Sequence, residues 1–251
     1  MTALRILHLY PHELGINGDA GNVLALRRRL EWRGIEAEVL LCGTGDPLPV
    51  DVDLVHIGSG PASARDAVLP DALRHRDALA AWADDGVPMI GIGAGFHLLS
   101  RSIETRDGSR RAALDVLPVV IRDRERRAVG EVLAEPSGGH RMAGYLNHGA
   151  SVMRDDGVPL ATLDHRSRSS AIHDDADRYE GVRIGSRIGT HLHGPILPMN
   201  PFIADELLAG ALARRGETLP DRDERTVAAD EHARLSRAAI ARRLGAAGVE
   251  V

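Results

Sequence analysis

The stretch Pro88-Met89-Ile90-Gly91-Ile92-Gly93-Ala94-Gly95-Phe96-His97-Leu98-Leu99 decides the fold. Its apolar start predicts a buried strand, its small residues predict a tight turn, and its apolar end predicts the start of a helix. In hydrolases a turn of this kind presents a nucleophile on a sharp elbow. Backbone N–H groups where the helix begins can hold an oxyanion. The segment is therefore typical of an active-site corner, and Gly93 lies at its tip.

Strands and helices alternate on the N-terminal side of this corner. The spacing of apolar residues predicts strands over 4–10, 37–41, 52–57 and 89–92, and helices over 23–32 and 70–84. Strands separated by helices of this length favour right-handed crossovers and a parallel sheet. On the C-terminal side the pattern predicts shorter, antiparallel or mixed strands over 116–120, 128–133, 144–146, 160–163, 170–172, 182–184 and 188–192. Helices over 201–215 and 227–244 follow, joined by a polar linker at 216–224.

Composition excludes several classes of function. The chain has 251 residues and a net charge of -5, so no overall basic field favours binding to nucleic acid. No apolar run approaches the roughly 20 residues of a membrane span, and the start does not resemble a signal peptide, so we expect a cytoplasmic protein. All basic residues are arginine, which excludes a lysine Schiff base and a P-loop lysine. The only cysteine, Cys42, is expected to be a small buried side chain rather than a nucleophile.

Four landmarks occur in order along the chain. They are the opening LRILHLYP with Gly18-Asp19-x-Gly21-Asn22, the corner at 91–97, Leu146-Asn147-His148-Gly149, and Gly189-Thr190-His191-Leu192-His193-Gly194-Pro195. Together they resemble the class I glutamine amidotransferases of the cobyric-acid-synthase type, most of all the glutaminase subunits of lipid II isoglutaminyl synthase. The resemblance covers residues 4–208. It implies the flavodoxin-like α/β fold of that family, with a central, mostly parallel sheet flanked by helices and an added antiparallel portion. We expect one domain over 1–251, with a C-terminal helical extension at 221–249.

The departures from the family pattern carry the functional expectation. The family has Gly-hydrophobic-Cys-Gly-Gly-aromatic-Gln at the corner, but here Gly93 stands at the cysteine, Ala94 at the next glycine and His97 at the glutamine. The loop after the third strand reads Gly58-Ser59-Gly60 and lacks the Gln and Asp of the family. Glutamine hydrolysis needs a thiolate, a base and donors to the oxyanion. Without the thiol we expect no hydrolysis by the family mechanism, and His193, at the position of the family base, becomes a relict.

The same resemblance implies a pocket beside the corner, lined by the loop after the third strand, the corner and the histidine segments. We expect it to contain Ser59, Gly60, Gly93, Ala94, His97, His148, His191 and His193. His191 and His193 would share one face of a strand, because strand side chains alternate. Three of these histidines could bind zinc, but clustering by chance among twelve histidines is the simpler interpretation, so we expect neither a metal nor a cofactor. The arginine-rich run at 122–127 is expected to be a solvated edge.

Three functions remain open at this point. The first is a degenerate, non-hydrolysing subunit, for which the resemblance implies a Mur-ligase-like, ATP-dependent amide ligase as partner. The second is an altered enzyme that uses Ser59, His97 and His193 in acid–base chemistry. The third is a protein that binds glutamine or another amino acid in the old pocket. The sequence identifies neither the partner ligase, nor the ligand, nor the oligomeric state.

Overall fold

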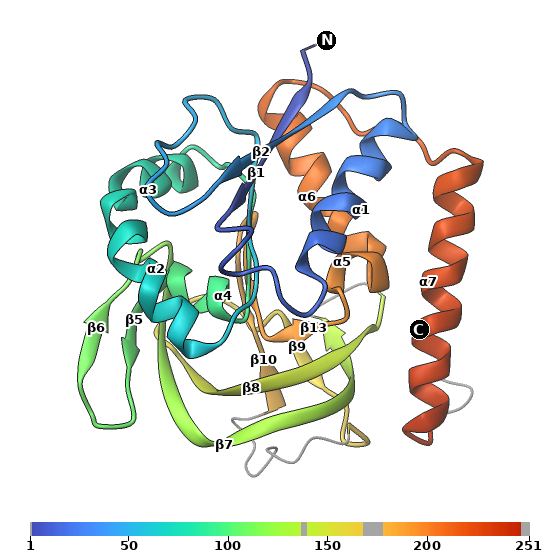
Figure 1. Ribbon diagram of the computed structural model, residues 1–251. Coiled ribbons are helices and arrows are strands. Elements are labelled where there is room, and N and C mark those ends of the chain that lie inside the picture. Colours follow the sequence, from blue (N-terminus) through green and yellow to red (C-terminus); the bar gives the residue numbers. More distant parts are fainter. Residues whose placement is uncertain (1, 137–139, 168–177, 247–251) are drawn as a thin grey trace.

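The structure is a computed structural model that describes residues 2–136, 140–167 and 178–246 (Figure 1). Its central sheet contains six strands in the order β11 (Val182–Ile184), β12 (Arg187–Thr190), β4 (Met89–Ile92), β3 (Leu54–Ile57), β1 (Leu4–Leu9) and β2 (Ala37–Cys42). The strands from β12 to β2 are parallel, and only β11 runs antiparallel to its neighbour. The expected mostly parallel sheet is confirmed.

Helices cover both faces of this sheet. One face carries α1 (Asp19–Glu31), α5 (Ile196–Met199) and α6 (Pro201–Arg214), and the other carries α2 (Ala62–Arg74), α3 (Arg76–Asp84) and α4 (Ala94–Leu99) (Figure 1). The apolar side chains of β1 alternate between the two layers. Leu4 and Ile6 pack in the core under α1 and α6, whereas Leu7 and Leu9 pack in the core under α2 and α4. This alternation follows from the two-residue period of a strand.

A second sheet closes one end of the molecule. It has the order β10 (Tyr179–Glu180), β9 (Ala161–Leu163), β7 (Leu117–Pro136), β5 (Ser100–Glu104) and β6 (Arg110–Ala112), with β8 (Met142–Arg154) paired to β7 and to β13 (Leu192–His193). All its pairs are antiparallel except that of β5 with β7. The ribbon of β7 and β8 passes under the carboxyl ends of the central strands (Figure 1). The added antiparallel portion is therefore confirmed.

The last helix, α7 (Glu224–Arg243), stands beside α1 and α5 at the edge of the molecule (Figure 1). Asp223 caps it by accepting a 2.8 Å hydrogen bond from the backbone N–H of Thr226. The buried Arg29 of α1 joins Asp205 of α6 to Asp230 of α7, with N–O distances of 2.5 and 2.6 Å. Part of the expected extension at 221–249, residues 247–249, lies outside the described residues.

Several expected boundaries were wrong. The helix expected over 70–84 is two helices, because α2 begins at Ala62 and the chain bends at His75 before α3. The strands expected over 116–120 and 128–133 are parts of β7, which has 20 residues and a register shift between Asp123 and Ala128. The expected strand at 170–172 lies outside the described residues. Within the described chain, no helix is both long and apolar enough to cross a membrane.

Candidate functional site

The corner at Gly93 has the geometry that its sequence predicted. Gly93 precedes α4 with φ 53° and ψ -109°, a backbone conformation that favours glycine because it has no Cβ. Its N–H donates to the carbonyl oxygen of Thr190 at 2.8 Å, which ties the corner to β12. Gly95 permits a second close approach, since a Cβ there would lie 2.3 Å from the carbonyl oxygen of Ile57. The small residues therefore bring β3, β4 and β12 together at one point.

Two side chains occupy the space in front of Gly93. A Cβ built on this residue would lie 2.8 Å from the hydroxyl oxygen of Ser59 and 3.2 Å from Cε1 of His193. Ser59 follows β3, whereas His193 ends β13, so the three residues come from distant parts of the chain. The structure thus brings Ser59, Gly93 and His193 together.

Ser59 is held on three sides. Its backbone N–H donates to the Asp19 carboxylate at 2.8 Å, and its carbonyl oxygen accepts from the N–H of Ile16 at 3.1 Å. Its hydroxyl accepts from the side-chain amide of Asn17, also at 3.1 Å. Burial raises the pKa of Asp19 to about 7, although the hydrogen bonds from Ser59 and Asn22 act in the opposite direction. The loop before α1 therefore fixes the side chain that faces Gly93.

A row of imidazoles lies beside the corner. His97 Nδ1 is 3.0 Å from an Arg65 nitrogen, and His97 Nε2 is 2.9 Å from His191 Nε2. Because a guanidinium can only donate, His97 must accept at Nδ1 and donate from Nε2, and His191 must accept at Nε2. The His148 ring stacks on His191 with a centroid separation of 4.0 Å. The neutral tautomers of His97 and His191 are thus set by Arg65.

The histidines of the site are uncharged at neutral pH. Burial, with a smaller effect of the Arg127 charge, lowers the pKa of His193 to about 4. Burial also lowers the pKa of His148 to about 4, and burial holds the pKa values of His97 and His191 well below the usual range. His193 is 4% exposed, and its Nδ1 has no hydrogen-bond partner among the described residues. An uncharged His193 retains the lone pair that a base needs.

A cavity of about 590 Å³ opens at the corner. Of the expected pocket residues it contains Ser59, Gly60, Gly93, Ala94, His97, His148 and His193. His191 was wrongly placed in this group, because it lies behind His97 and His148 and does not line the cavity. The irregular chain between β12 and β13 breaks the simple alternation on which that expectation depended.

Charged side chains on the opposite wall were missed by sequence analysis. Arg65 of α2, which is 1% exposed, forms paired hydrogen bonds of 2.9 and 3.0 Å with the Asp123 carboxylate. Arg127 donates to the backbone and side-chain oxygens of Asn147 at 2.9 and 2.8 Å. The expectation of a solvated edge at 122–127 was thus wrong for Asp123, which is paired with the buried Arg65, whereas Arg127 is exposed and also lines the cavity. Alternating charges along one strand do not indicate which residues of other elements will face that strand.

A buried carboxylate supports the histidine segment from behind. Glu180 accepts from the backbone N–H of His191 at 2.6 Å and from the Thr190 hydroxyl at 2.9 Å. Burial raises its pKa to about 7, against the lowering effect of these hydrogen bonds. Thr190 Oγ1 in turn accepts from the N–H of Leu192 at 3.0 Å. These bonds hold the chain where it leaves the central sheet and enters the second one, and sequence analysis did not identify Glu180.

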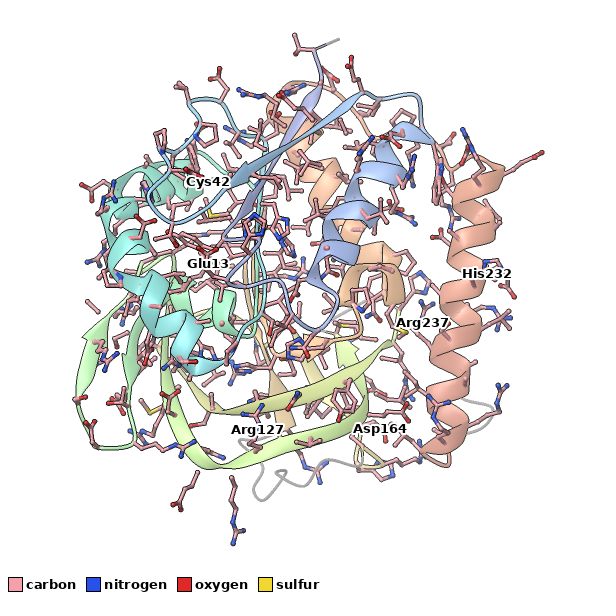
Figure 2. The ribbon with its side chains drawn as sticks, in the orientation of Figure 1. Glu13, Cys42, Arg127, Asp164, His232 and Arg237 are labelled. Atoms are coloured by element: carbon pink, nitrogen blue, oxygen red, sulfur yellow. The ribbon has the colours of Figure 1, made fainter. Side chains whose placement is uncertain are left out.

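Cys42 lies away from this site. It ends β2, is 2% exposed and belongs to the apolar core, as expected. Figure 2 shows it near the edge of the central sheet, well separated from Arg127 on β7. Burial raises the pKa of its thiol, which disfavours the thiolate. Cys42 is not among the residues that line the cavity at Gly93.

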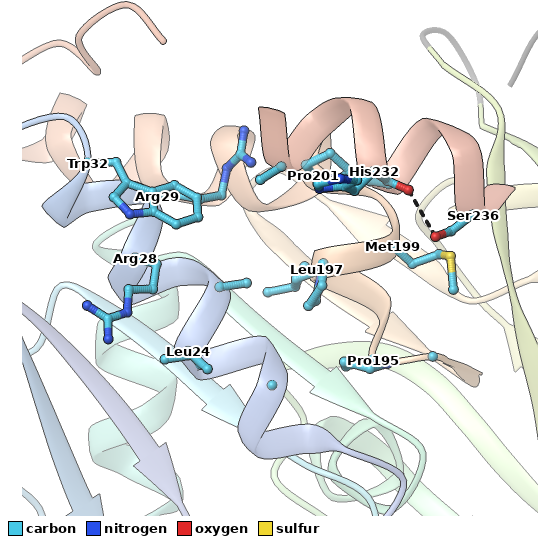
Figure 3. A pocket seen from close by; sticks show the side chains of 16 residues that line it. Leu24, Arg28, Arg29, Trp32, Pro195, Leu197, Met199, Pro201, His232 and Ser236 are labelled. Atoms are coloured by element: carbon cyan, nitrogen blue, oxygen red, sulfur yellow. Dashed lines mark hydrogen bonds between the residues drawn. The ribbon is translucent and has the colours of Figure 1, made fainter. Parts of the chain in front are cut away.

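Two further features of the described residues concern possible metal ligands and a second cavity. Among the described residues, no group of three or more His, Cys, Asp or Glu side chains is arranged to hold a metal ion. A mainly apolar cavity of about 570 Å³ lies between α1, α5 and α7 (Figure 3). Leu24 of α1 and Trp32, which follows that helix, face Leu197 and Met199 of α5 across it. This cavity contains none of the side chains that face Gly93.

Known proteins resemble this chain in sequence and in fold. Residues 5–201 match the model of the CobB/CobQ-like glutamine amidotransferase domain. The chain is 30% identical, over 217 residues, to the GatD subunit of lipid II isoglutaminyl synthase (glutamine-hydrolyzing) of Staphylococcus aureus, covering 86% of this chain and 87% of that protein. It is 24% identical to the GatD subunit of Streptococcus pneumoniae, covering 84% of this chain and 82% of that protein. Among solved structures, PurLQS from Thermotoga maritima matches with a TM-score of 0.53 and 18% identity, over 84% of this chain and 99% of that chain. The last match concerns the fold alone.

Proposed function

This chain belongs to the CobB/CobQ-like glutamine amidotransferase family, and from that premise we propose that it is a subunit that does not hydrolyse glutamine. One observation carries the proposal. The corner that would present the nucleophile holds Gly93, and the hydroxyl of Ser59 lies 2.8 Å from the place of the missing Cβ. A covalent thioester cannot form on a residue that has no side chain.

The surrounding chemistry supports this proposal. His193 lies beside Gly93, but it has no thiol to activate. Cys42 cannot substitute, because it is buried in the core at the end of β2. Loss of an activated nucleophile typically lowers kcat by about a millionfold. The fold and the backbone of the corner are retained, which is consistent with a role in assembly rather than in cleavage of an amide.

The partner of this subunit would be a Mur-ligase-like, ATP-dependent amide ligase. The basis is the similarity to two proteins that are named as subunits of lipid II isoglutaminyl synthase. In such a complex the ligase would take its nitrogen from free ammonia or another amine, and this chain would stabilise or position the ligase. Amide formation would then depend on ammonium salts and not on glutamine.

The test uses the purified chain, alone and with a Mur-ligase-like protein from the same organism. Release of glutamate from glutamine is measured by a coupled assay, and amide formation is measured with either ammonium chloride or glutamine as nitrogen source. We expect no glutamate above the blank, and amide formation with ammonium only. Turnover of glutamine by the wild-type chain would overturn the proposal.

The cavity itself favours a second candidate function, binding of a small molecule. It is open, has about 590 Å³ and carries both arginine and aspartate side chains, which suit an amino acid with two opposite charges. Stabilisation against heat by glutamine or glutamate, without turnover, would identify such a role. An altered enzyme that uses Ser59 would instead form a covalent adduct at that residue, which mass spectrometry would detect.

A further inference from the structure

We infer that Ser59, and not Gly93 alone, keeps this corner from holding a thiol, so that restoring hydrolysis requires changes at both positions. The inference depends on the proposed function and extends it to a second residue. A Cβ at Gly93 would lie 2.8 Å from Ser59 Oγ and 3.3 Å from Ser59 Cβ. Carbon and oxygen atoms that are not bonded to each other do not approach this closely without displacement.

Ser59 has little freedom to make room. It is 3% exposed, and its backbone is bonded on one side to Asp19 and on the other to Ile16. Rotation of the hydroxyl would break its hydrogen bond from Asn17, and it would leave Ser59 Cβ where it is. His193 confines the same space from the opposite side, with Cε1 at 3.2 Å from the Cβ position. A cysteine at Gly93 would therefore meet a fixed neighbour on each side.

The contacts of Ser59 are those of a packed hydroxyl rather than of an activated nucleophile. An activated serine donates its hydrogen bond to a base. The described contacts of Ser59 Oγ include a donor, Asn17, and none joins this oxygen to His193. The unpartnered Nδ1 of His193 likewise finds no hydroxyl. Ser59 thus fills the volume of the absent side chain.

Glycine at position 59 would remove the closer of the two neighbours that confine a side chain at position 93. Ser59→Gly deletes both atoms that crowd the Cβ position and leaves the backbone bonds to Asp19 and Ile16 in place. The thiol of a Gly93→Cys, Ser59→Gly variant would then face His193. Attack of this sulfur on the side-chain amide carbon of glutamine would expel ammonia, with the proton supplied through His193, and water would release glutamate from the thioester.

The experiment compares Gly93→Cys, Gly93→Cys with Ser59→Gly, Ser59→Gly alone and the wild type. Alkylation by iodoacetamide, in which sulfur displaces iodide, is followed by mass spectrometry from pH 6 to 9, with Cys42 in the wild type as the background. We expect the double variant to be alkylated at position 93 at least tenfold faster than Gly93→Cys, and to release glutamate when the single variant does not. Equal alkylation rates in the two variants would overturn the inference while leaving the proposed function intact.

A double-mutant cycle of stability measurements, which uses no cysteine variant, keeps the test decisive if the cysteine variants fold poorly. The melting temperatures of Gly93→Ala, Ser59→Gly and the combined variant are compared with that of the wild type. We expect Ser59→Gly to recover at least half of the loss caused by Gly93→Ala. Additive losses would contradict the inference. Labelling of wild-type Ser59 by a fluorophosphonate would also overturn it, because the hydroxyl would then be a nucleophile.

Discussion

At the scale of single residues, Gly93 combines two constraints, a positive φ and close neighbours at its Cβ position, of which Gly34 meets only the first. The φ of 53° at Gly93 disfavours any side chain, and its surroundings leave no room for one. Gly34, in the turn that follows α1, has a φ of 75° but no neighbouring atom within 4 Å of its Cβ position. Substitutions at these two glycines therefore distinguish the cost of backbone strain from the cost of steric collision.

We expect Gly93→Ala to be clearly more destabilising than Gly34→Ala. Positive φ alone costs a residue with a Cβ about 1 kcal/mol, and overpacking of a full site adds about 1–3 kcal/mol. Gly34→Ala should thus lose only the first contribution, whereas Gly93→Ala should lose both. Urea unfolding of the two variants measures the difference. Equal losses would mean that Ser59 and His193 move aside without resistance.

The residue scale also shows what the sequence predicted about the site and why it missed the rest. Gly93 and His193 were identified because each belongs to a short motif whose residues are contiguous. Arg65 and Asp123 are 58 positions apart, and nothing in either segment indicates that they form an ion pair over the cavity. Contacts of that kind arise from packing of α2 against the second sheet, which a linear pattern does not contain.

At the scale of elements, the strands β3 and β4 were predicted well because all their residues are buried, most are apolar, and a glycine follows each strand. The long strand β7 was not, because its charged middle reads as a loop in isolation. That stretch is held in the sheet by its pairing with β8 on both sides of the irregularity at 123–128. A tertiary partner thus overrides a weak local preference.

One buried arginine of α1 contributes to the attachment of α7. Arg29 has a side chain that is 5% exposed, and it bonds two carboxylates, Asp205 and Asp230, from two other helices. A cavity separates part of α7 from α1 and α5 (Figure 3), whereas Ile240 and Leu244 reach a small core. Truncating Arg29 would leave Asp205 paired with Arg33 and Asp230 paired with the exposed Arg222.

We expect Arg29→Ala to destabilise the protein by about 2 kcal/mol or more, because it removes a buried guanidinium that is hydrogen-bonded to two carboxylates. The segment that carries α7 should also become sensitive to limited proteolysis. Arg27→Ala is the matched control on the same helix, since the Arg27 side chain is 48% exposed and its ion pair among the described residues is with Glu31, one turn along the helix. Its loss should be within about 0.5 kcal/mol. A small effect of Arg29→Ala would show that the other contacts of α7, among them those of Arg237 with Met199 and of Arg243 with Glu131, are enough to hold it.

At the scale of the whole molecule, the site lies where the two sheets meet. The chain leaves the central sheet after Thr190 and enters the second sheet at Leu192, and His193 pairs there with Tyr145 of β8. Histidines lie at this junction and on strands of the central sheet. His8 and His56 are neighbours on β1 and β3, with ring centroids 4.9 Å apart. Several uncharged imidazoles are thus buried in one region of the fold.

This arrangement predicts sensitivity to acid. Burial, with a smaller effect of His12, lowers the pKa of His8 to about 4, and burial and the neighbouring His8 hold the pKa of His56 well below the usual range. Between pH 6.5 and 4 the unfolded chain therefore binds more protons than the folded one, so these groups make stability fall as the pH falls. Asp19 and Glu180, with pKa values raised to about 7, act in the opposite direction.

The variant His56→Leu isolates the contribution of one of these histidines to the loss of stability at low pH. His56 is fully buried, and neither ring nitrogen has a partner among the described residues. His56→Leu should therefore unfold no more easily than the wild type at pH 7, and it should lose about 2 kcal/mol less on transfer to pH 5. Urea unfolding at the two pH values measures this difference, with the exposed His232→Leu as control. If His56→Leu loses as much stability as the wild type, the acid response arises from other groups, and His56 is not held neutral by its burial.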